Sequence, residues 1–167
     1  AAHAQTPLSC GQLAVGTILA AGERDQFTFF GEEGDVVNIV IAEGGDIDPL
    51  FLVVGRLLQP GGSLLTTLGQ ATQNIDRLPT TGTYTVELFD NIGTNRGNYA
   101  LRLGWVLPLS KQCGDRATVR CGEVVNGSIA TPLERDFYSF SGQQGDALTL
   151  ELVQPVGQNG LTVGVRL

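Results

Sequence analysis

The sequence predicts an all-β fold, a jelly-roll-like β-sandwich of about eight strands followed by a half-length second sandwich repeat. Three observations lead to this prediction. Apolar residues alternate over short runs, and no long stretch shows the 3.6-residue period of a helix. The 23 glycines supply frequent tight turns. A block of sequence also recurs at a constant offset of 111 residues, as from Cys10 to Cys121, which indicates a repeated unit.

The strands of the first copy are predicted from runs of apolar and β-branched residues bounded by Gly, Pro, Asn and Asp. The expected strands are Gln12–Ala20, Asp25–Phe30, Val36–Ala42, Leu50–Val54, Leu64–Leu68, Gln73–Leu78, Thr83–Phe89 and Tyr99–Trp105. Because side chains alternate across a strand, Phe27 and Phe29 should both enter the core. By the same rule, Tyr84, Val86 and Leu88 should share one face.

The repeat is clearest where ERDQFTFFGEEGD, from Glu23, is matched by ERDFYSFSGQQGD, from Glu134. The two copies agree at 11 of 33 positions when residues 10–42 are aligned with residues 121–153. The second copy predicts strands at Glu123–Ala130, Asp136–Phe140, Ala147–Val153 and Leu161–Leu167. We therefore expect a first unit at 10–107, a linker at 108–120 and a partial unit at 121–167. A half sandwich should expose its inner apolar face and its unpaired strand edges.

The order of short motifs in the first copy resembles the bacterial pre-peptidase C-terminal domain, which is related to collagen-binding domains of secreted proteases. The matching pieces, in chain order, are ERDQFTF, GEEGD, DIDPLFL, QPGG, LPTTGTYTVEL and GNYAL. The resemblance covers about 10–107 fully and 121–167 as a partial second copy. It implies a small jelly-roll sandwich without catalytic activity, which sits beside an exported enzyme or in a surface protein.

The same resemblance raises the question of calcium, because some family members bind it through acidic residues near the first strand. The segment before residue 10 carries no carboxylate here, so that site is not expected. Asp46, Asp48 and Asp90 are the candidate oxygen ligands for calcium, since carboxylates are its usual ligands. The alternative is that Asp48 caps a turn before Pro49 and that Asp46 is solvated.

The three cysteines and the start of the chain suggest an exported protein. The sequence begins with an A-x-A pattern like a signal-peptidase site, and disulfides persist outside the cytosol. We expect Cys113 and Cys121 to pair and to stiffen the linker, which leaves Cys10 free or bonded to another chain. The alternative pairing is Cys10 with Cys113, which would tie together the ends of the first unit.

Several motifs that match functional patterns by letter have structural explanations. Leu78–Gly82 reads LPTTG, but sortase needs that motif near a C-terminus, so we expect a turn. Asn126 opens a glycosylation sequon, yet its Gly127 aligns with Gly16 and indicates a turn or bulge. The ERD triplets could suggest paired carboxylates. At the start of a strand, however, Asp25 is better explained as a turn cap, with Arg24 neutralising its charge.

Composition and the missing chemical motifs favour a non-catalytic protein. The net charge of −7, with the basic residues spread singly, argues against binding to nucleic acid, and no run is long enough to span a membrane. We expect no catalytic site and no resident cofactor other than the possible calcium. The preferred hypothesis is a structural protein of the cell surface, which self-associates when the half sandwich 121–167 is completed by another subunit, as in a fibre. The alternative is a module that targets a larger secreted enzyme, such as a protease, to a matrix or polymer.

Overall fold

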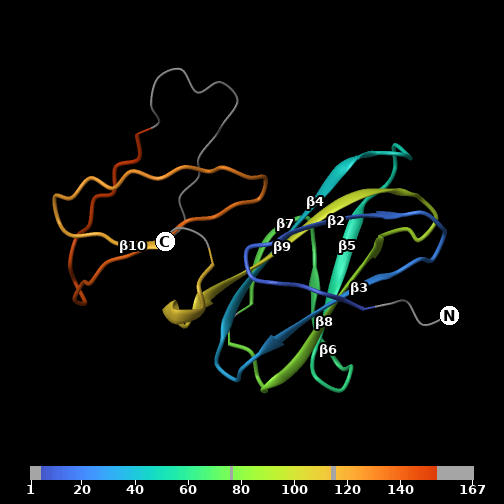
Figure 1. Ribbon diagram of the computed structural model, residues 1–167, viewed down its shortest axis with the longest axis horizontal. Coiled ribbons are helices and arrows are strands. Elements are labelled where there is room, and N and C mark those ends of the chain that lie inside the picture. The colour runs from blue at the N-terminus through green and yellow to red at the C-terminus, as the bar shows by residue number, and fades with distance from the viewer. Residues whose placement is uncertain (1–4, 76, 114–115, 154–167) are drawn as a thin grey trace.

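Two sheets pack face to face in the first part of the computed structural model, which describes residues 5–75, 77–113 and 116–153 (Figure 1). One sheet has the strand order β1-β3-β8-β5-β6 and the other has the order β2-β9-β4-β7. The strands of the sandwich are β1 (Thr6–Pro7), β2 (Leu13–Ile18), β3 (Asp25–Gly31), β4 (Val36–Asp46), β5 (Val53–Leu58), β6 (Leu64–Leu68), β7 (Ala71–Ile75), β8 (Gly82–Asp90) and β9 (Gly97–Leu107). The fold is therefore all-β, as the sequence predicts.

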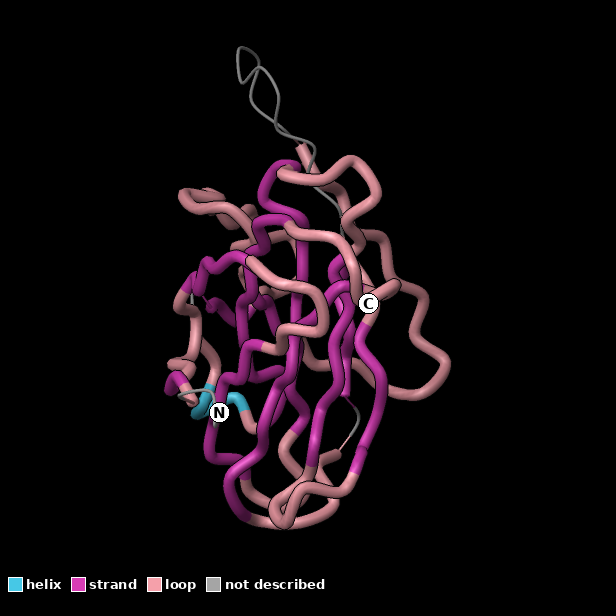
Figure 2. The backbone as a smooth tube through the Cα atoms, turned by 90° about the vertical axis from the view of Figure 1, so that its right-hand side faces the viewer, coloured by secondary structure: helices cyan, strands magenta, loops and turns pink. Residues whose placement is uncertain are grey.

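The segment that follows the sandwich has little regular structure. It contains the short 3-10 helix η1 (Leu109–Lys111) and two short strands, β10 (Arg116–Thr118) and β11 (Phe137–Ser139), which pair with each other in parallel. Figure 1 draws residues 116–153 in orange and red beside the sandwich, and Figure 2 shows that most of this segment is loop.

The alternation in β8 becomes burial in the way the sequence predicts. Tyr84, Val86 and Leu88 are fully buried and point toward the second sheet. The ring of Phe29 stacks on Tyr84, with ring centroids 5.5 Å apart, and meets the edge of Trp105 at 5.8 Å. Phe27 is buried as well. Aromatic pairs of this kind add stabilisation beyond their buried area, so these rings form the centre of the core.

Two strands of the sandwich lie away from their predicted positions. The strand expected at Leu50–Val54 is β5 at Val53–Leu58, and the strand expected at Gln73–Leu78 is β7 at Ala71–Ile75. Pairing with β8 sets the position of β5, because Val53 faces Asp90 and the ladder runs on to Leu58. The prediction from apolar content placed this strand too early, because apolar content does not show which residues pair with a neighbouring strand.

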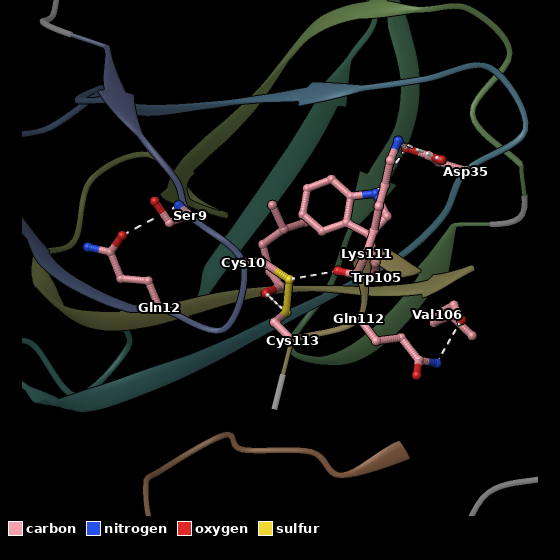
Figure 3. Close-up of a disulfide and its surroundings, with 10 residues drawn as sticks. Ser9, Cys10, Gln12, Asp35, Trp105, Val106, Lys111, Gln112 and Cys113 are labelled. Atoms are coloured by element: carbon pink, nitrogen blue, oxygen red, sulfur yellow. Dashed lines mark hydrogen bonds and ion pairs between the residues drawn. A yellow bond between two sulfur atoms is a disulfide. The ribbon is translucent and has the colours of Figure 1, made fainter. Parts of the chain in front are cut away.

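The predicted disulfide between Cys113 and Cys121 is wrong. The structure joins Cys10 to Cys113, whose Cα atoms are 5.5 Å apart (Figure 3). The cause is the antiparallel pairing of β2 with β9, in which Leu13 faces Arg102. That pairing carries the residues before β2 and after β9 to the same edge of the sandwich, and the Gly11 amide donates to the Leu103 carbonyl at 2.8 Å. Cys10 is thus bonded within its own chain, while Cys121 is a free, exposed thiol.

A buried carboxylate fastens η1 to the sandwich next to the disulfide (Figure 3). Asp35 is 3% exposed and accepts hydrogen bonds from the Trp105 indole at 2.9 Å and from the Lys111 ammonium at 2.9 Å. The Glu32 amide donates to the same carboxylate at 3.0 Å, and the Glu32 carboxylate lies 2.7 Å from Lys111. Burial by itself would raise the pKa of Asp35. The hydrogen bonds from Glu32, Trp105 and Lys111 outweigh it and hold the pKa below its usual value.

Loss of the Cys10–Cys113 disulfide should destabilise the sandwich. The bond closes a loop with a sequence separation of 103, so we expect Cys113→Ser to lower the free energy of unfolding by about 2–5 kcal/mol. Urea unfolding can be followed by the fluorescence of Trp105, which is the one tryptophan and lies in this unit. The matched control is Cys121→Ser, which should leave the midpoint unchanged. Equal effects of the two substitutions would contradict the pairing.

The Asp35 carboxylate should make stability depend on pH in acid. Because its folded pKa lies below 3.8, its contribution is present above pH 3.8 and is lost as pH falls through the folded pKa. We expect Asp35→Asn to cost roughly 1–3 kcal/mol at pH 7, with the difference from wild type shrinking below about pH 3.8. Urea midpoints measured between pH 2.5 and about 7 test this, and a gap that stays constant in acid would contradict it.

Candidate functional site

The segment 116–153 repeats the strand pairing of the first unit at an offset of 111 residues. In the first unit β1 lies parallel to β3, with Thr6 facing Phe27. In the second segment β10 lies parallel to β11, with Ala117 facing Tyr138. The next hydrogen bond is also repeated, from Leu8 N to Thr28 O at 2.8 Å and from Val119 N to Ser139 O at 2.8 Å. The register of this pairing is therefore the same in both places.

The turn before β3 also recurs, and it assigns a role to the ERD motif that differs from the predicted one. The carboxylate of Glu23 accepts from the Ala20 amide at 2.8 Å, and that of Glu134 accepts from the Thr131 amide at 2.7 Å. The glutamate, and not the following aspartate, caps the turn. Asp25 instead accepts from the Tyr99 hydroxyl at 2.5 Å, a bond that depends on β9.

The turn after β3 is a second shared element. Asp35 accepts from the Glu32 amide at 3.0 Å, and Asp146 accepts from the Gln143 amide at 2.7 Å. The preceding glycines, at 34 and 145, have φ of 85° and 97°, a region that favours glycine. These local contacts explain why the sequence match between the copies is strongest at the turns.

What differs between the two segments is the presence of partner strands. In the first unit β2 pairs with β9, β3 pairs with β1 and β8, and β4 lies between β9 and β7. At an offset of 111, the described residues of the second segment extend only to the equivalent of Ala42 in β4. A strand needs a neighbour to accept its backbone hydrogen bonds, so only the pairing equivalent to β1–β3 forms in the described residues.

The strands predicted for the second copy are accordingly mostly absent from the described residues. Glu123–Ala130 and Ala147–Val153 are not strands, and Asp136–Phe140 is reduced to β11. Leu161–Leu167 lies outside the described residues. The prediction failed here because alternation identifies residues that suit a strand but not whether a partner strand is present.

A set of large apolar side chains is consequently exposed on the second segment. We call Tyr138, Phe140, Leu148, Leu150 and Leu152 the apolar face. These residues are 43–55% exposed, whereas their equivalents in the first unit are 0–6% exposed. The equivalents are Phe27, Phe29, Val37, Ile39 and Ile41. Full burial of one such side chain contributes about 1.5–3 kcal/mol, so covering the apolar face would release several kcal/mol.

Cys121 lies near the start of this segment, and the backbone around it has the same local geometry as the backbone around Cys10. The following glycines have φ of 74° at Gly11 and 78° at Gly122. The Gln12 side chain accepts from the Ser9 amide at 3.4 Å, and the Glu123 side chain accepts from the Arg120 amide at 2.9 Å. Cys121 thus occupies the position of a residue that is disulfide-bonded in the first unit, although sequence reasoning had assigned it to the linker bridge.

The aspartates that the sequence offered as calcium ligands have other partners. Asp90 is buried and accepts from four backbone amides, of Leu52, Gly93, Thr94 and Asn95, at 2.8–3.1 Å. Burial by itself would raise the pKa of Asp90. The four hydrogen bonds outweigh burial and hold the pKa below its usual value. Asp48 accepts from the Arg96 amide at 2.8 Å and from its guanidinium at 3.2 Å. Both aspartates therefore stabilise loops.

A calcium site at these aspartates stays a prediction, because the Asp46 side chain lies outside the described part of the structure. Within that part, no group of three or more His, Cys, Asp or Glu residues is arranged to hold a metal ion.

The remaining motifs have structural explanations. The LPTTG stretch forms a turn in which Leu78 is buried and the Tyr84 hydroxyl donates to the Thr80 carbonyl at 2.6 Å. Gly127 of the sequon lies in neither a turn nor a bulge, contrary to the prediction, and its reason is steric, because a Cβ there would meet the Tyr138 hydroxyl. The part of the chain that the structure describes contains no helix with the length and apolar character to cross a bilayer.

The fold defines the class of the first unit as a small jelly-roll-like β-sandwich, and similar solved structures are known. The pre-peptidase C-terminal domain of a collagenase from Bacillus anthracis is similar at 14% identity, with a TM-score of 0.50, over 62% of this chain and 97% of that chain. A periplasmic inhibitor of g-type lysozyme from Aeromonas hydrophila is similar at 12% identity, with a TM-score of 0.47, over 62% of this chain and 99% of that one. No family model and no curated protein sequence matches the chain. The likeness to the collagenase domain establishes a fold of the pre-peptidase C-terminal type.

Hydrogen exchange should separate the two copies residue by residue. Amides of 36–42 lie between β9 and β7, whereas their equivalents at 147–153 have no strand partner among the described residues. At a dilution where the chain is monomeric, we expect 147–153 to exchange at least about a hundredfold faster than 36–42. Residues 137–139, paired with β10, should be intermediate and serve as the internal control. Equal protection of 36–42 and 147–153 would show that the second copy is already paired.

Proposed function

We propose that this protein is a non-catalytic extracellular assembly protein whose second unit is completed by strands from another subunit, as in a surface fibre or a similar polymer. The apolar face carries this proposal. Its five residues align with core residues of the first unit, and they sit in a segment whose turns and register already match that unit. A surface that is built as the inside of a sandwich is best explained by a partner that completes the sandwich.

The use of the carboxylates supports a non-catalytic role. A general acid or base needs an ionisable group that is poised to reach a substrate. Asp35 and Asp90 instead hold a helix and a loop through hydrogen bonds, and the Asp25 carboxylate is occupied by Tyr99. The likeness of fold to the pre-peptidase C-terminal domain agrees with this proposal but does not carry it.

An extracellular location is supported by the chemistry of the first unit. The Cys10–Cys113 disulfide joins two distant parts of the chain, and such structural disulfides persist in oxidising compartments.

A second candidate function is a binding module for an extracellular polymer or matrix, and one observation favours it. At one end of the sandwich, Leu50 and Ile92 are 70% and 63% exposed on neighbouring loops. These loops are joined by the bond from the Asn95 amide group to the Leu50 carbonyl, at 3.0 Å. Apolar loop tips held by a rigid sandwich suit recognition of a ligand. This site is distant in sequence from the apolar face, so the two functions can be tested separately.

Assembly through the apolar face predicts a specific response to mutation. We expect the purified chain to associate in a concentration-dependent way, giving masses above 17.6 kDa in light scattering after size exclusion. Leu150→Asp should weaken association at least about tenfold, because it places a charge in an apolar contact. The matched control, Gln144→Asp, adds the same charge on an exposed turn whose equivalent in the first unit, Glu33, is also exposed, and it should associate normally. A monomer at every concentration would contradict assembly and leave the binding module.

A further inference from the structure

This inference rests on the proposed function. We propose that the second unit is completed by a strand equivalent to β9, that a cysteine follows this strand, and that this cysteine bonds to Cys121. This completing segment has a defined pattern: alternating apolar residues, a tyrosine near the strand start and a cysteine after the strand. The first unit supplies the evidence, because it shows what covers the equivalent residues.

The position of the partner strand follows from the sheet order. In the first unit β9 lies between β2 and β4 and is antiparallel to both, with Ala100 facing Val15 on one side and Ala42 on the other. The residues equivalent to β2 and β4 are 124–129 and 147–157, of which the structure describes 124–129 and 147–153. A strand inserted between them would satisfy two unpaired edges at once.

The residues that the partner needs are those that β9 directs into the core. Tyr99, Leu101, Leu103 and Trp105 alternate along β9, and all four are buried. They pack against the residues whose equivalents form the apolar face. A partner strand with this alternation would bury the apolar face, whereas the same residues in another order would not.

The tyrosine requirement comes from two contacts of Tyr99 in the first unit, with Gly16 and Asp25, whose equivalents recur in the second unit. In the first unit Gly16 leaves room for the Tyr99 ring, whose hydroxyl donates to Asp25 at 2.5 Å. The second unit carries Gly127 and Asp136 at the same positions. There, the hydroxyl of Tyr138 occupies the space beside Gly127. Tyr138 is equivalent to Phe27, which has no hydroxyl and points into the core. A partner tyrosine would therefore take this space as Tyr138 turns inward.

The cysteine requirement comes from the disulfide of the first unit. Cys113 follows β9 and reaches Cys10 because β9 pairs with β2. Cys121 has the backbone turn of Cys10 and a free thiol. A strand that occupies the β9 position would carry a following cysteine to Cys121 in the same way.

The bond forms by thiol–disulfide exchange, in which the partner cysteine is initially held as a mixed disulfide with a small thiol. The Cys121 thiolate attacks the partner's cysteine sulfur, the new S–S bond forms and the old one breaks, and the small thiol leaves as its thiolate. The proton of Cys121 goes to solvent. The low-molecular-weight disulfide that made the mixed disulfide is the oxidant, so the step needs no other electron acceptor.

The test uses the full chain, with its Cys10–Cys113 bond intact, and a synthetic peptide with the sequence of residues 97–113. The peptide carries two added lysines at its amino end for solubility, and its cysteine is activated as a 2-thiopyridyl disulfide. The control peptide has the same composition and the same terminal cysteine, with the residues before it in permuted order. Release of 2-thiopyridone gives the rate, and mass spectrometry of non-reduced digests identifies the cysteine that reacted.

We expect the native-order peptide to react with Cys121 at least about tenfold faster than the permuted peptide, because binding raises the effective concentration of its cysteine. Leu150→Asp should remove this rate difference, whereas Gln144→Asp should preserve it. Replacing the peptide's tyrosine by alanine should remove most of it. Cys121→Ser should give no adduct.

Equal rates for the two peptides would overturn this inference. If Leu150→Asp still disperses the assembly, the proposed function would stand with a different completing segment. A fast reaction of the native-order peptide with a chain that never associates would instead retain the partner strand and reject self-assembly. Reaction that is fast but insensitive to Leu150→Asp would also overturn the inference, because the peptide would then not be using the apolar face.

Discussion

The insertion of β9 between β2 and β4 is the interaction on which most of the first unit depends. This one strand brings Cys10 to Cys113, Tyr99 to Asp25 and Trp105 to Asp35. It also buries one side of the core. In the second segment no equivalent strand is present among the described residues. There, the disulfide partner and the buried core are missing together, which is the behaviour of a cooperative unit.

Comparison of the two copies separates what short-range interactions determine from what a distant strand determines. The capped turns at Glu23 and Glu134 and the parallel pairs β1–β3 and β10–β11 form in both copies. The residues that form these turns and pairs lie close together in the sequence, within a single supersecondary motif. Longer strands and a buried core form only in the first unit, where β8 and β9 are present. The same sequence pattern therefore gives two structures, and long-range pairing accounts for the difference.

Much of the first unit could be predicted from sequence because alternation and turn chemistry are local. Phe29, Tyr84 and the LPTTG turn are examples, since their neighbours along the chain determine their roles. The sequence left Cys10–Cys113 only as the alternative pairing, because Cys10 meets Cys113 through the ladder between β2 and β9. The role of Asp25 was missed for the same reason, since its partner is 74 residues away. For the apolar face, the offset of 111 was the available signal, because it aligns exposed residues with buried ones.

The parallel pair β10–β11 has a consequence for the kinetics of completion. When a strand binds to an unfolded segment, the chain on both sides of the incoming strand must become ordered. The loss of conformational entropy makes such binding slow. Here the β10–β11 ladder and the capped turns already fix the chain on either side of residues 120–136. The search for an incoming strand is then confined to a partly ordered template, and less ordering remains for the moment of contact. The partly ordered second segment can therefore act as a nucleation site for an incoming strand.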